Sequence, residues 1–402
     1  MYNLLPKPII VSITRDVKRR VEMSLRILVF EALIYASLAT KNMFSQYFDL
    51  TGYSSVEIGF LMAVLPVISL FSSPFWFRLG QKIGESRVYY IVSLASIVLI
   101  WPVFLSTSFP LAMLFMIGLS FFFSGVVPIG DSLIMSSIKL RGGLFSRVRL
   151  CGTLGFAVIS LLMSQIVGVS FFWLFAVGSV VLILSLFTMR SEETGKAPRK
   201  SIRQSREDGT LFEFGVMTVG MFFGITLNSF HNSFIPIFTR EMGMAVSAVG
   251  VIFAITALSE IPFLAYADRI IAKLGNTLVL EIGMLIIAIR MILISFSTNT
   301  LFLYSVELLH GLTYILMYYS LFDYIHFRLP KKHLTSAQSV FWTIRSGMTF
   351  IAGSIGGGFV IQSFSITFAF RVFGIAGLIA TAGMFILTSR KTLSRRFGKV
   401  KS

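Results

Sequence analysis

Ionisable side chains occur inside the long apolar segments of this chain, and they have the clearest capacity for chemistry. The set contains both signs in both halves of the sequence: Glu31, Lys41, Asp131, Arg149, Glu260, Arg290, Glu307, His310 and Arg345. Each such group costs about 3 kcal/mol at the centre of a membrane, so it normally pairs with another charge or lines a wet cavity. Carboxylates and guanidinium groups around a cavity could bind a polar solute through paired hydrogen bonds and could exchange protons. The alternative is that they only hold helices together as ion pairs.

Patterns typical of enzymes or bound cofactors are missing from the sequence. The four His and the one cysteine, Cys151, do not form a metal-ligand cluster, and no GxxxxGK[ST] phosphate-binding loop occurs. We therefore expect no enzyme, no metal and no cofactor. The net charge of +17 could suggest a nucleic-acid partner. However, the Lys and Arg residues lie almost entirely between apolar segments, so the lipid bilayer is the expected partner and nucleic acid is not.

The elements that must position these residues are membrane-spanning helices. Hydrophobic residues make up 55% of the chain and charged residues 13%. The apolar runs have the length of roughly 20 residues that crosses a bilayer, without the alternating polarity of a barrel strand. We predict an all-α integral membrane protein with twelve spans, at residues 23–48, 55–79, 88–107, 109–138, 150–169, 171–189, 212–238, 247–267, 276–297, 301–325, 337–362 and 366–388.

Basic residues predict the orientation of the chain in the membrane. They gather in the even-numbered connections and in the C-terminal tail, whereas among the short odd-numbered connections only Arg240 is basic. Basic loops stay in the cytoplasm. Both termini should therefore be cytoplasmic, in a multi-pass protein of the plasma membrane. The polar stretch from Arg190 to Gly209 should be a cytoplasmic linker.

The two halves of the sequence resemble each other. An offset of 191 residues places Gly59 on Gly250, Arg78 on Arg269, Lys82 on Lys273 and Gly84 on Gly275. We therefore divide the chain into an N-terminal six-helix bundle (1–190), the linker (191–210) and a C-terminal six-helix bundle (211–402). A parallel duplication of six spans is the symmetry of major facilitator transporters, in which two bundles rock about a central site to give alternating access.

Four sequence phrases carry a resemblance to a known family: YSSVEIGFLMAVLPV (53–67), SRVRLCGTLGFA (146–157), ALSEIPF (257–263) and VELLHGLTY (306–314). They are similar to the lactose-permease-like oligosaccharide:proton symporters of the major facilitator superfamily. They are equally similar to its phenylpropionate-permease-like and nucleoside-symporter branches. The resemblance covers most of the chain.

This resemblance implies roles for individual residues. Asp131 and Arg149 match the family's substrate-binding carboxylate and Arg, and Phe156 matches its sugar-stacking Trp. In the second half, the matches to the family's coupling residues are Glu260, Arg290, His310 and Arg345. Three positions depart from the family pattern. Thr313 replaces the titrating Glu, His231 or Asn228 replaces a seventh-span Asp, and Gln81-Lys82 replaces a loop Asp before Lys.

The favoured function is proton-coupled symport of a small polar solute, with a saccharide or glycoside as the expected substrate, by a monomer. Asp131 and Arg149 could equally bind an aromatic acid or a nucleoside. Efflux of amphipathic compounds is a second possibility, because 41 Phe and 18 Met could form an adaptable pocket. A sensor or scaffold without transport is the alternative from another class. With Thr313 in place of the titrating Glu, we expect Glu260 or, second, Glu307 to exchange the coupling proton as it approaches or leaves Arg290.

Overall fold

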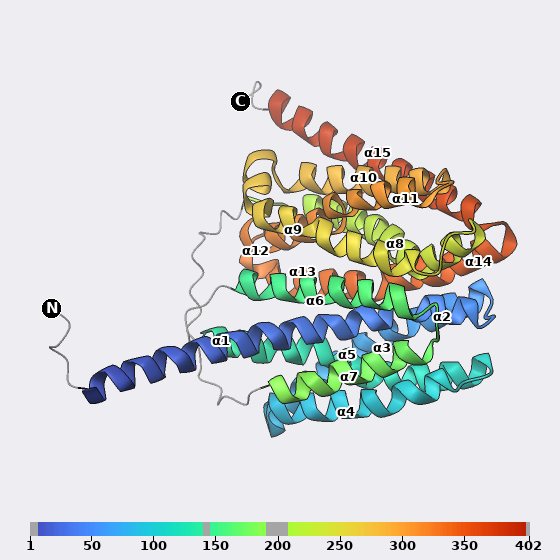
Figure 1. Ribbon diagram of the computed structural model, residues 1–402. Coiled ribbons are helices and arrows are strands. Elements are labelled where there is room, and N and C mark those ends of the chain that lie inside the picture. The colour runs from blue at the N-terminus through green and yellow to red at the C-terminus, as the bar shows by residue number, and fades with distance from the viewer. Residues whose placement is uncertain (1–6, 140–144, 190–207, 399–402) are drawn as a thin grey trace.

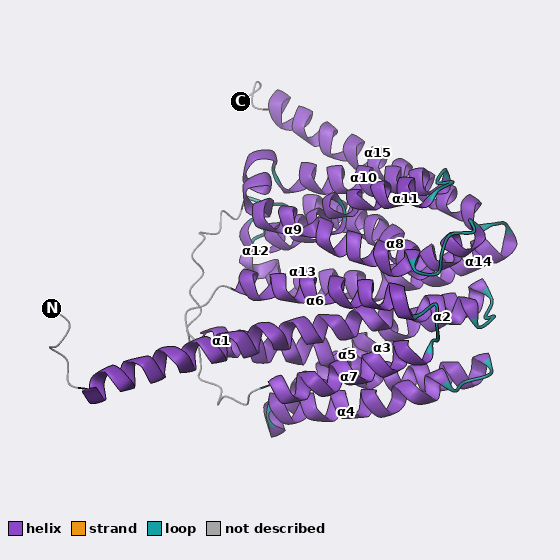
Figure 2. Ribbon diagram, in the orientation of Figure 1, coloured by secondary structure: helices purple, strands orange, loops and turns teal. Residues whose placement is uncertain are grey.

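The computed structural model describes residues 7–139, 145–189 and 208–398, and within these ranges helices joined by short loops form the chain without any strand (Figure 2). The first half contains α1 (Lys7–Asn42), α2 (Phe44–Leu50), α3 (Ser55–Ile83), α4 (Glu85–Phe104), α5 (Phe109–Lys139), α6 (Phe145–Ile166) and α7 (Phe172–Thr188). These helices fill the lower half of Figure 1.

The second half fills the upper part of Figure 1. It contains α8 (Leu211–Glu241), α9 (Ala248–Leu274), α10 (Asn276–Ser295), α11 (Thr300–Glu307), η1 (Leu308–Leu312), α12 (Tyr314–Phe327), η2 (Lys331–His333), α13 (Leu334–Thr343), η3 (Ile344–Met348), η4 (Ile351–Ile355), α14 (Gly356–Ser363) and α15 (Ile366–Gly398). The predicted linker, 191–210, lies outside the described residues except for its last three.

The predicted all-helical membrane fold is confirmed. In the described part of the chain, nine helical segments are long and apolar enough to cross a membrane. A tenth is α9, which bends by 63° just after the helix-breaking Pro262. Two shorter apolar helical segments, Phe172–Thr188 and Ile351–Ser363, complete the set. Eleven of the twelve predicted spans coincide with one of these segments, whereas the eleventh, 337–362, overlaps Ile351–Ser363 only in its second half.

Three spans contain interruptions that differ from the regular helices predicted from the sequence. The first breaks at Met43 into α1 and α2. The eleventh contains two turns of π-helix, η3 and η4, with Arg345 in the first of them. A π-turn inserts an extra residue into a helix and is frequent at functional sites. The tenth span is also interrupted, by the 3₁₀ turn η1 at His310.

The sequence repeat at an offset of 191 residues is visible in the helix boundaries. Helix α4 and helix α10 coincide at both ends under this offset, and α5 and α11 begin at equivalent residues. In the described part of the chain, four glycines have positive φ, and they form two equivalent pairs: Gly52 (94°) with Gly243 (67°) and Gly84 (94°) with Gly275 (83°). Positive φ strains residues that carry a Cβ, so each glycine permits the turn at a helix end.

The two halves pack closely at the α2 end of the molecule. A Cβ at Gly59 of α3 would overlap the carbonyl oxygen of Ser354 in the other half, and a Cβ at the equivalent Gly250 of α9 would overlap that of Ser160 on α6. The two close contacts are therefore related by the same repeat. They require glycine because the helix backbones touch.

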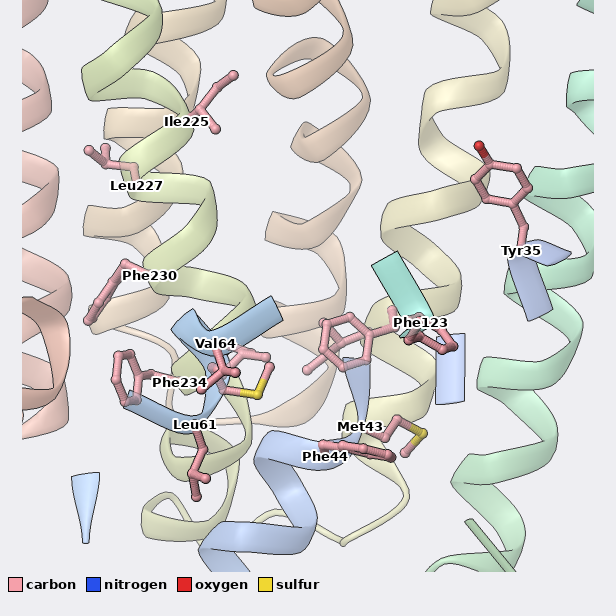
Figure 3. Packing of buried hydrophobic residues seen from close by; sticks show 14 of the residues in the cluster. Tyr35, Met43, Phe44, Leu61, Val64, Phe123, Ile225, Leu227, Phe230 and Phe234 are labelled. Carbon is pink, nitrogen blue, oxygen red and sulfur yellow. The ribbon is translucent and has the colours of Figure 1, made fainter. Parts of the chain in front are cut away.

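Hydrogen bonds and a shared core close the same end. Ser45 of α2 donates to the carbonyl of Ser233 (2.7 Å), and Gln46 donates to that of Val246 (2.8 Å). Arg240 Nε donates to Asp49 Oδ2 at 2.8 Å. Buried apolar side chains from both halves belong to one cluster, including Leu61 and Val64 of α3 and Phe230 and Phe234 of α8 (Figure 3).

Candidate functional site

The first half contributes Asp131 from α5 and Arg149 from α6, brought together around Tyr35 of α1. The Tyr35 hydroxyl donates to Asp131 Oδ2 at 3.2 Å, while the guanidinium carbon of Arg149 lies 3.7 Å from the centre of the Tyr35 ring. Arg149 also forms an ion pair with Glu31 (3.5 Å). A guanidinium over an aromatic face is held by both charge and stacking. These four side chains therefore form one polar cluster.

The close packing of α6 against α1 places Arg149 in this cluster. A Cβ at Gly155 would overlap the backbone of Ala32, and one at Gly152 would approach the Tyr35 ring to 2.7 Å. Only residues without a side chain allow this approach of two helices. The Arg149 side chain stays 37% exposed, whereas Glu31 is fully buried. Arg149 can thus present its free N–H groups to a solute while the ion pair with the buried Glu31 fixes the position of its guanidinium group.

The second half places Arg345 opposite this cluster. Its Nε and one terminal nitrogen donate to the Tyr314 hydroxyl at 3.1 and 2.7 Å, and its guanidinium carbon lies 4.8 Å from the Tyr318 ring centre. Arg345 and Asp131 attract each other electrostatically across the interface between the halves. Arg149 in turn interacts with Glu260 and Tyr314. The charged groups of both halves therefore lie near one another at the interface between the halves.

An aromatic ladder runs from η1 along α12. The rings of His310, Tyr314, Tyr318 and Phe322 stack in sequence, with successive centroid distances of 6.5, 6.1 and 5.9 Å and angles between the ring planes of 5°, 11° and 16°. The four residues recur every fourth position, which puts them on one helix face. Tyr314, Tyr318 and Phe322 are not among the site residues predicted from the sequence, although their four-residue spacing is a signal that could have identified them.

A second polar cluster is buried inside the second half. Arg290 of α10 forms an ion pair with Glu307 of α11, and both side chains are fully buried. His231 Nε2 lies 2.8 Å from Glu307 Oε1 and 3.1 Å from Arg290. His310 Nδ1 lies 3.0 Å from Arg290, and its Nε2 lies 3.1 Å from Glu260 Oε1. The five side chains form one continuous network.

The network has a fully buried end and a more accessible end. Glu307 and His231 are inaccessible, whereas the side chain of Glu260 is 20% exposed. Glu260 connects to Arg290 through His310, and Glu307 contacts Arg290 directly. At the position of the family's titrating Glu, Thr313 donates to the His310 carbonyl (2.7 Å) and so completes the turn that carries His310.

The remaining sequence candidates lie at the edges of these clusters. Asn228 is buried on α8 with its side-chain oxygen unpaired, and the neighbour that contacts His231 Nδ1 is Asn232, at 3.1 Å. Phe156 is half-buried on α6 and packs against the apolar core. Lys41 belongs to neither cluster and lines a separate cavity.

Several buried polar atoms keep unused hydrogen-bonding capacity. They are Asp131 Oδ1, both carboxylate oxygens of Glu31, and Arg290 Nε. Buried groups normally find partners, so an unpaired acceptor on Asp131 suits a site where a solute binds. In the residues that the structure describes, no three His, Cys, Asp or Glu side chains lie close enough together to hold a metal ion.

Two packed six-helix bundles with charged groups facing each other across their interface define a secondary transporter of the major facilitator superfamily. The chain belongs to the MFS_1 like family, whose model matches residues 23–372.

Similarity to individual proteins agrees with this assignment. The chain is 25% identical over 349 residues to the maltose permease of Geobacillus stearothermophilus, covering 84% of this chain and 87% of the permease. It is also 25% identical over 333 residues to the uncharacterized transporter YwbF of Bacillus subtilis (strain 168), covering 81% and 83% of the two chains.

Solved structures share the fold. The crystal structure of the nucleoside transporter NupG superposes with a TM-score of 0.76 at 17% identity, covering 91% of this chain and 99% of that one. A POT family transporter superposes with a TM-score of 0.71 at 12% identity, covering 92% and 96%. At these identities the likeness concerns the fold.

Proposed function

We propose that this transporter is a proton-coupled symporter of a small polar solute, with a saccharide or glycoside as substrate, and that it works by alternating access. The observation that carries the proposal is the arrangement of Asp131 and Arg149 on one half opposite Arg345 and its tyrosines on the other. A solute between them would contact both bundles, so its binding would favour their movement together. Similarity to a maltose permease supports a sugar as the solute.

The chemistry of the site suits a sugar ring. Asp131 offers an acceptor, and Arg149 and Arg345 offer forked donors that can bind neighbouring hydroxyl groups. Tyr318, in the aromatic ladder, offers a face for the apolar side of the ring. A nucleoside is the second candidate substrate, because a planar base would stack on the same ladder.

We assign proton coupling to the buried network of the second half. Glu260 lies at its accessible end, so it can take up a proton from the central space. Protonation would convert its carboxylate from an acceptor into a donor toward His310 Nε2, and His310 would then reorganise its contact with Arg290. Glu307, paired directly with Arg290, is the second candidate. Both proposals place the proton at the network and the solute at the interface.

We retain the predicted domain limits and orientation as part of the proposal. The bundles comprise residues 1–190 and 211–402, the linker comprises 191–210, and both termini lie in the cytoplasm. In this orientation the closely packed α2 end faces the outside of the cell, where Asp49 and Arg240 join the halves. The structure then represents an externally closed state. The protein acts as a monomer in the plasma membrane.

Flux into proteoliposomes tests the proposal. Maltose should accumulate against its own gradient when a pH gradient is imposed, and should only equilibrate without one. The Glu260→Gln variant should lose accumulation but retain counterflow, because exchange of solute needs no net proton movement. Glu281→Gln is a matched control, since Glu281 is a buried carboxylate bonded to Thr388 (2.8 Å), outside the network.

Two results would contradict the proposal in different ways. Accumulation by both Glu260→Gln and Glu307→Gln would assign coupling to another group, with Asp131 or Glu31 next. The absence of any effect of the pH gradient on wild-type flux of maltose, of other glycosides or of nucleosides would exclude proton coupling.

A further inference from the structure

Lys41 lies in the interior of the first half, away from both polar clusters. It is on α1, ten residues after Glu31 and thus about 15 Å farther along the helix, and only 9% of its surface is exposed. It lines a cavity enclosed by α1, α2, α3, α4, α5 and α7. About 10 Å³ of this cavity can take the centre of a water-sized sphere, which is room for roughly one water molecule or one monatomic ion.

The charge of Lys41 has no counter-charge in the described part of the chain. The acidic side chains that the structure describes in the first half have other partners: Glu31 pairs with Arg149, Asp49 with Arg240, Asp131 with Tyr35, Glu57 with Ser54 and Glu85 with Ser132. Among the described residues, no salt bridge joins a carboxylate to Lys41. An unpaired buried ammonium is strongly destabilising in a bilayer. An anion bound in the cavity beside Lys41 would compensate this charge.

The internal repeat shows what is missing from this cavity. Under the offset of 191 residues, Met116 and Leu119 of the cavity wall are equivalent to Glu307 and His310 of the buried network in the second half. The second half thus compensates its buried Arg290 with a carboxylate of its own. At the positions equivalent to Arg290 and Glu307 the first half has Leu99 and Met116, so it lacks that ion pair altogether. Its buried cation, Lys41, lies at a different position, equivalent to Asn232.

The cavity lining is suited to a small anion. Lys41 can provide up to three N–H donors. The hydroxyls of Ser37, Thr40 and Ser96 donate to backbone carbonyls of their own helices at 2.6, 2.7 and 2.7 Å, while Ser120 forms no hydrogen bond in the described structure and can donate into the cavity. The rest of the wall is apolar, which favours an ion with a weakly held hydration shell over a carboxylate or phosphate that needs many donors.

We propose that this cavity binds one small monovalent anion of the chloride class, coordinated by Lys41 and Ser120. The anion compensates the charge of Lys41 and holds α1 against α5 within the first bundle. It is separate from the solute site and independent of the proposed substrate and coupling ion.

Thermal unfolding of the purified protein in detergent tests this site. Replacing gluconate with chloride at constant ionic strength should raise Tm saturably, by on the order of a few degrees, and bromide should substitute for chloride. Lys41→Met keeps an apolar side chain of similar length without the charge. It should lose the chloride effect and should be at least as stable as wild type in gluconate. Ser120→Ala should need more chloride for the same rise.

Lys82→Met is the matched control, because Lys82 is exposed near the end of α3. It should show the wild-type chloride response. A wild-type Tm that is the same in chloride and gluconate would overturn the proposal, and so would an equal chloride response in Lys41→Met. Should Lys41→Met not fold, Lys41→Gln and the wild-type titration with chloride and bromide decide the question.

Discussion

Replacing Glu307 by Gln should destabilise the protein far more than replacing Glu260 by Gln. Glu307 contacts both Arg290 and His231, and all three side chains are fully buried. The substitution keeps the shape of the side chain but removes its charge. Arg290 would then remain as an unpaired cation in the interior of the second bundle.

The magnitude follows from burial and from the number of contacts. Removing one partner of a buried ion pair costs about 3–5 kcal/mol, because the other charge stays desolvated. Glu260 makes one contact, to His310 at 3.1 Å, and its side chain is 20% exposed. The loss of one such hydrogen bond costs about 1 kcal/mol. We therefore expect the difference in stability between the two variants to be about 2–4 kcal/mol.

The assay is chemical or thermal unfolding of purified variants in one detergent. The double variant Arg290→Met/Glu307→Leu is the control, since it removes both charges together and should recover most of the lost stability. A double-mutant cycle over Arg290 and Glu307 then measures their coupling.

A Glu307→Gln variant as stable as Glu260→Gln would refute the reasoning, because Arg290 would then be compensated by something other than Glu307. A double variant no more stable than Glu307→Gln alone would refute it as well, since the cost would not come from the unpaired charge.

Three further predictions concern the interface and the topology. Arg149→Lys should lower uptake nearly as much as Arg149→Ala, by at least about tenfold, because Lys keeps the charge but loses the planar fork; normal uptake by the Lys variant would exclude forked recognition. Gly59→Ala and Gly250→Ala should each lower Tm and uptake, because overpacking should lower the free energy of unfolding by about 1–3 kcal/mol. Gly215→Ala is the control and should lower neither, because a Cβ at Gly215 would have no other atom within 4 Å. A cysteine at Ser201 should resist labelling from outside intact cells, and efficient labelling would reverse the orientation.

The span positions and the internal repeat could be predicted from the sequence because they depend on local composition. Apolar runs of bilayer length must be helical in lipid, and glycines that permit sharp turns recur at a fixed offset. Gly84 and Gly275 belong to the predicted repeat, and both adopt positive φ.

The grouping of the charged residues could not be predicted, because it depends on which helix faces meet. The sequence suggests that the charged residues form a single group around one cavity, with Glu260 beside Arg290. The structure divides the charges into an interface cluster and a buried network, and inserts His310 between Glu260 and Arg290. The break at Met43 and the π-turn at Arg345 also escaped prediction, since neither has a local signal such as proline.

The reciprocal contacts at Gly59 and Gly250 have an evolutionary consequence. In a symmetric dimer, a residue on one subunit touches a given position on the partner, and the partner returns the same contact. The two halves of this chain touch in that reciprocal way, through α3 against η4 and α9 against α6. The interface is therefore the one that two copies of a six-helix ancestor would form. The cores of the two halves nevertheless differ, because Met116 of the first half occupies the position equivalent to the buried Glu307 of the second.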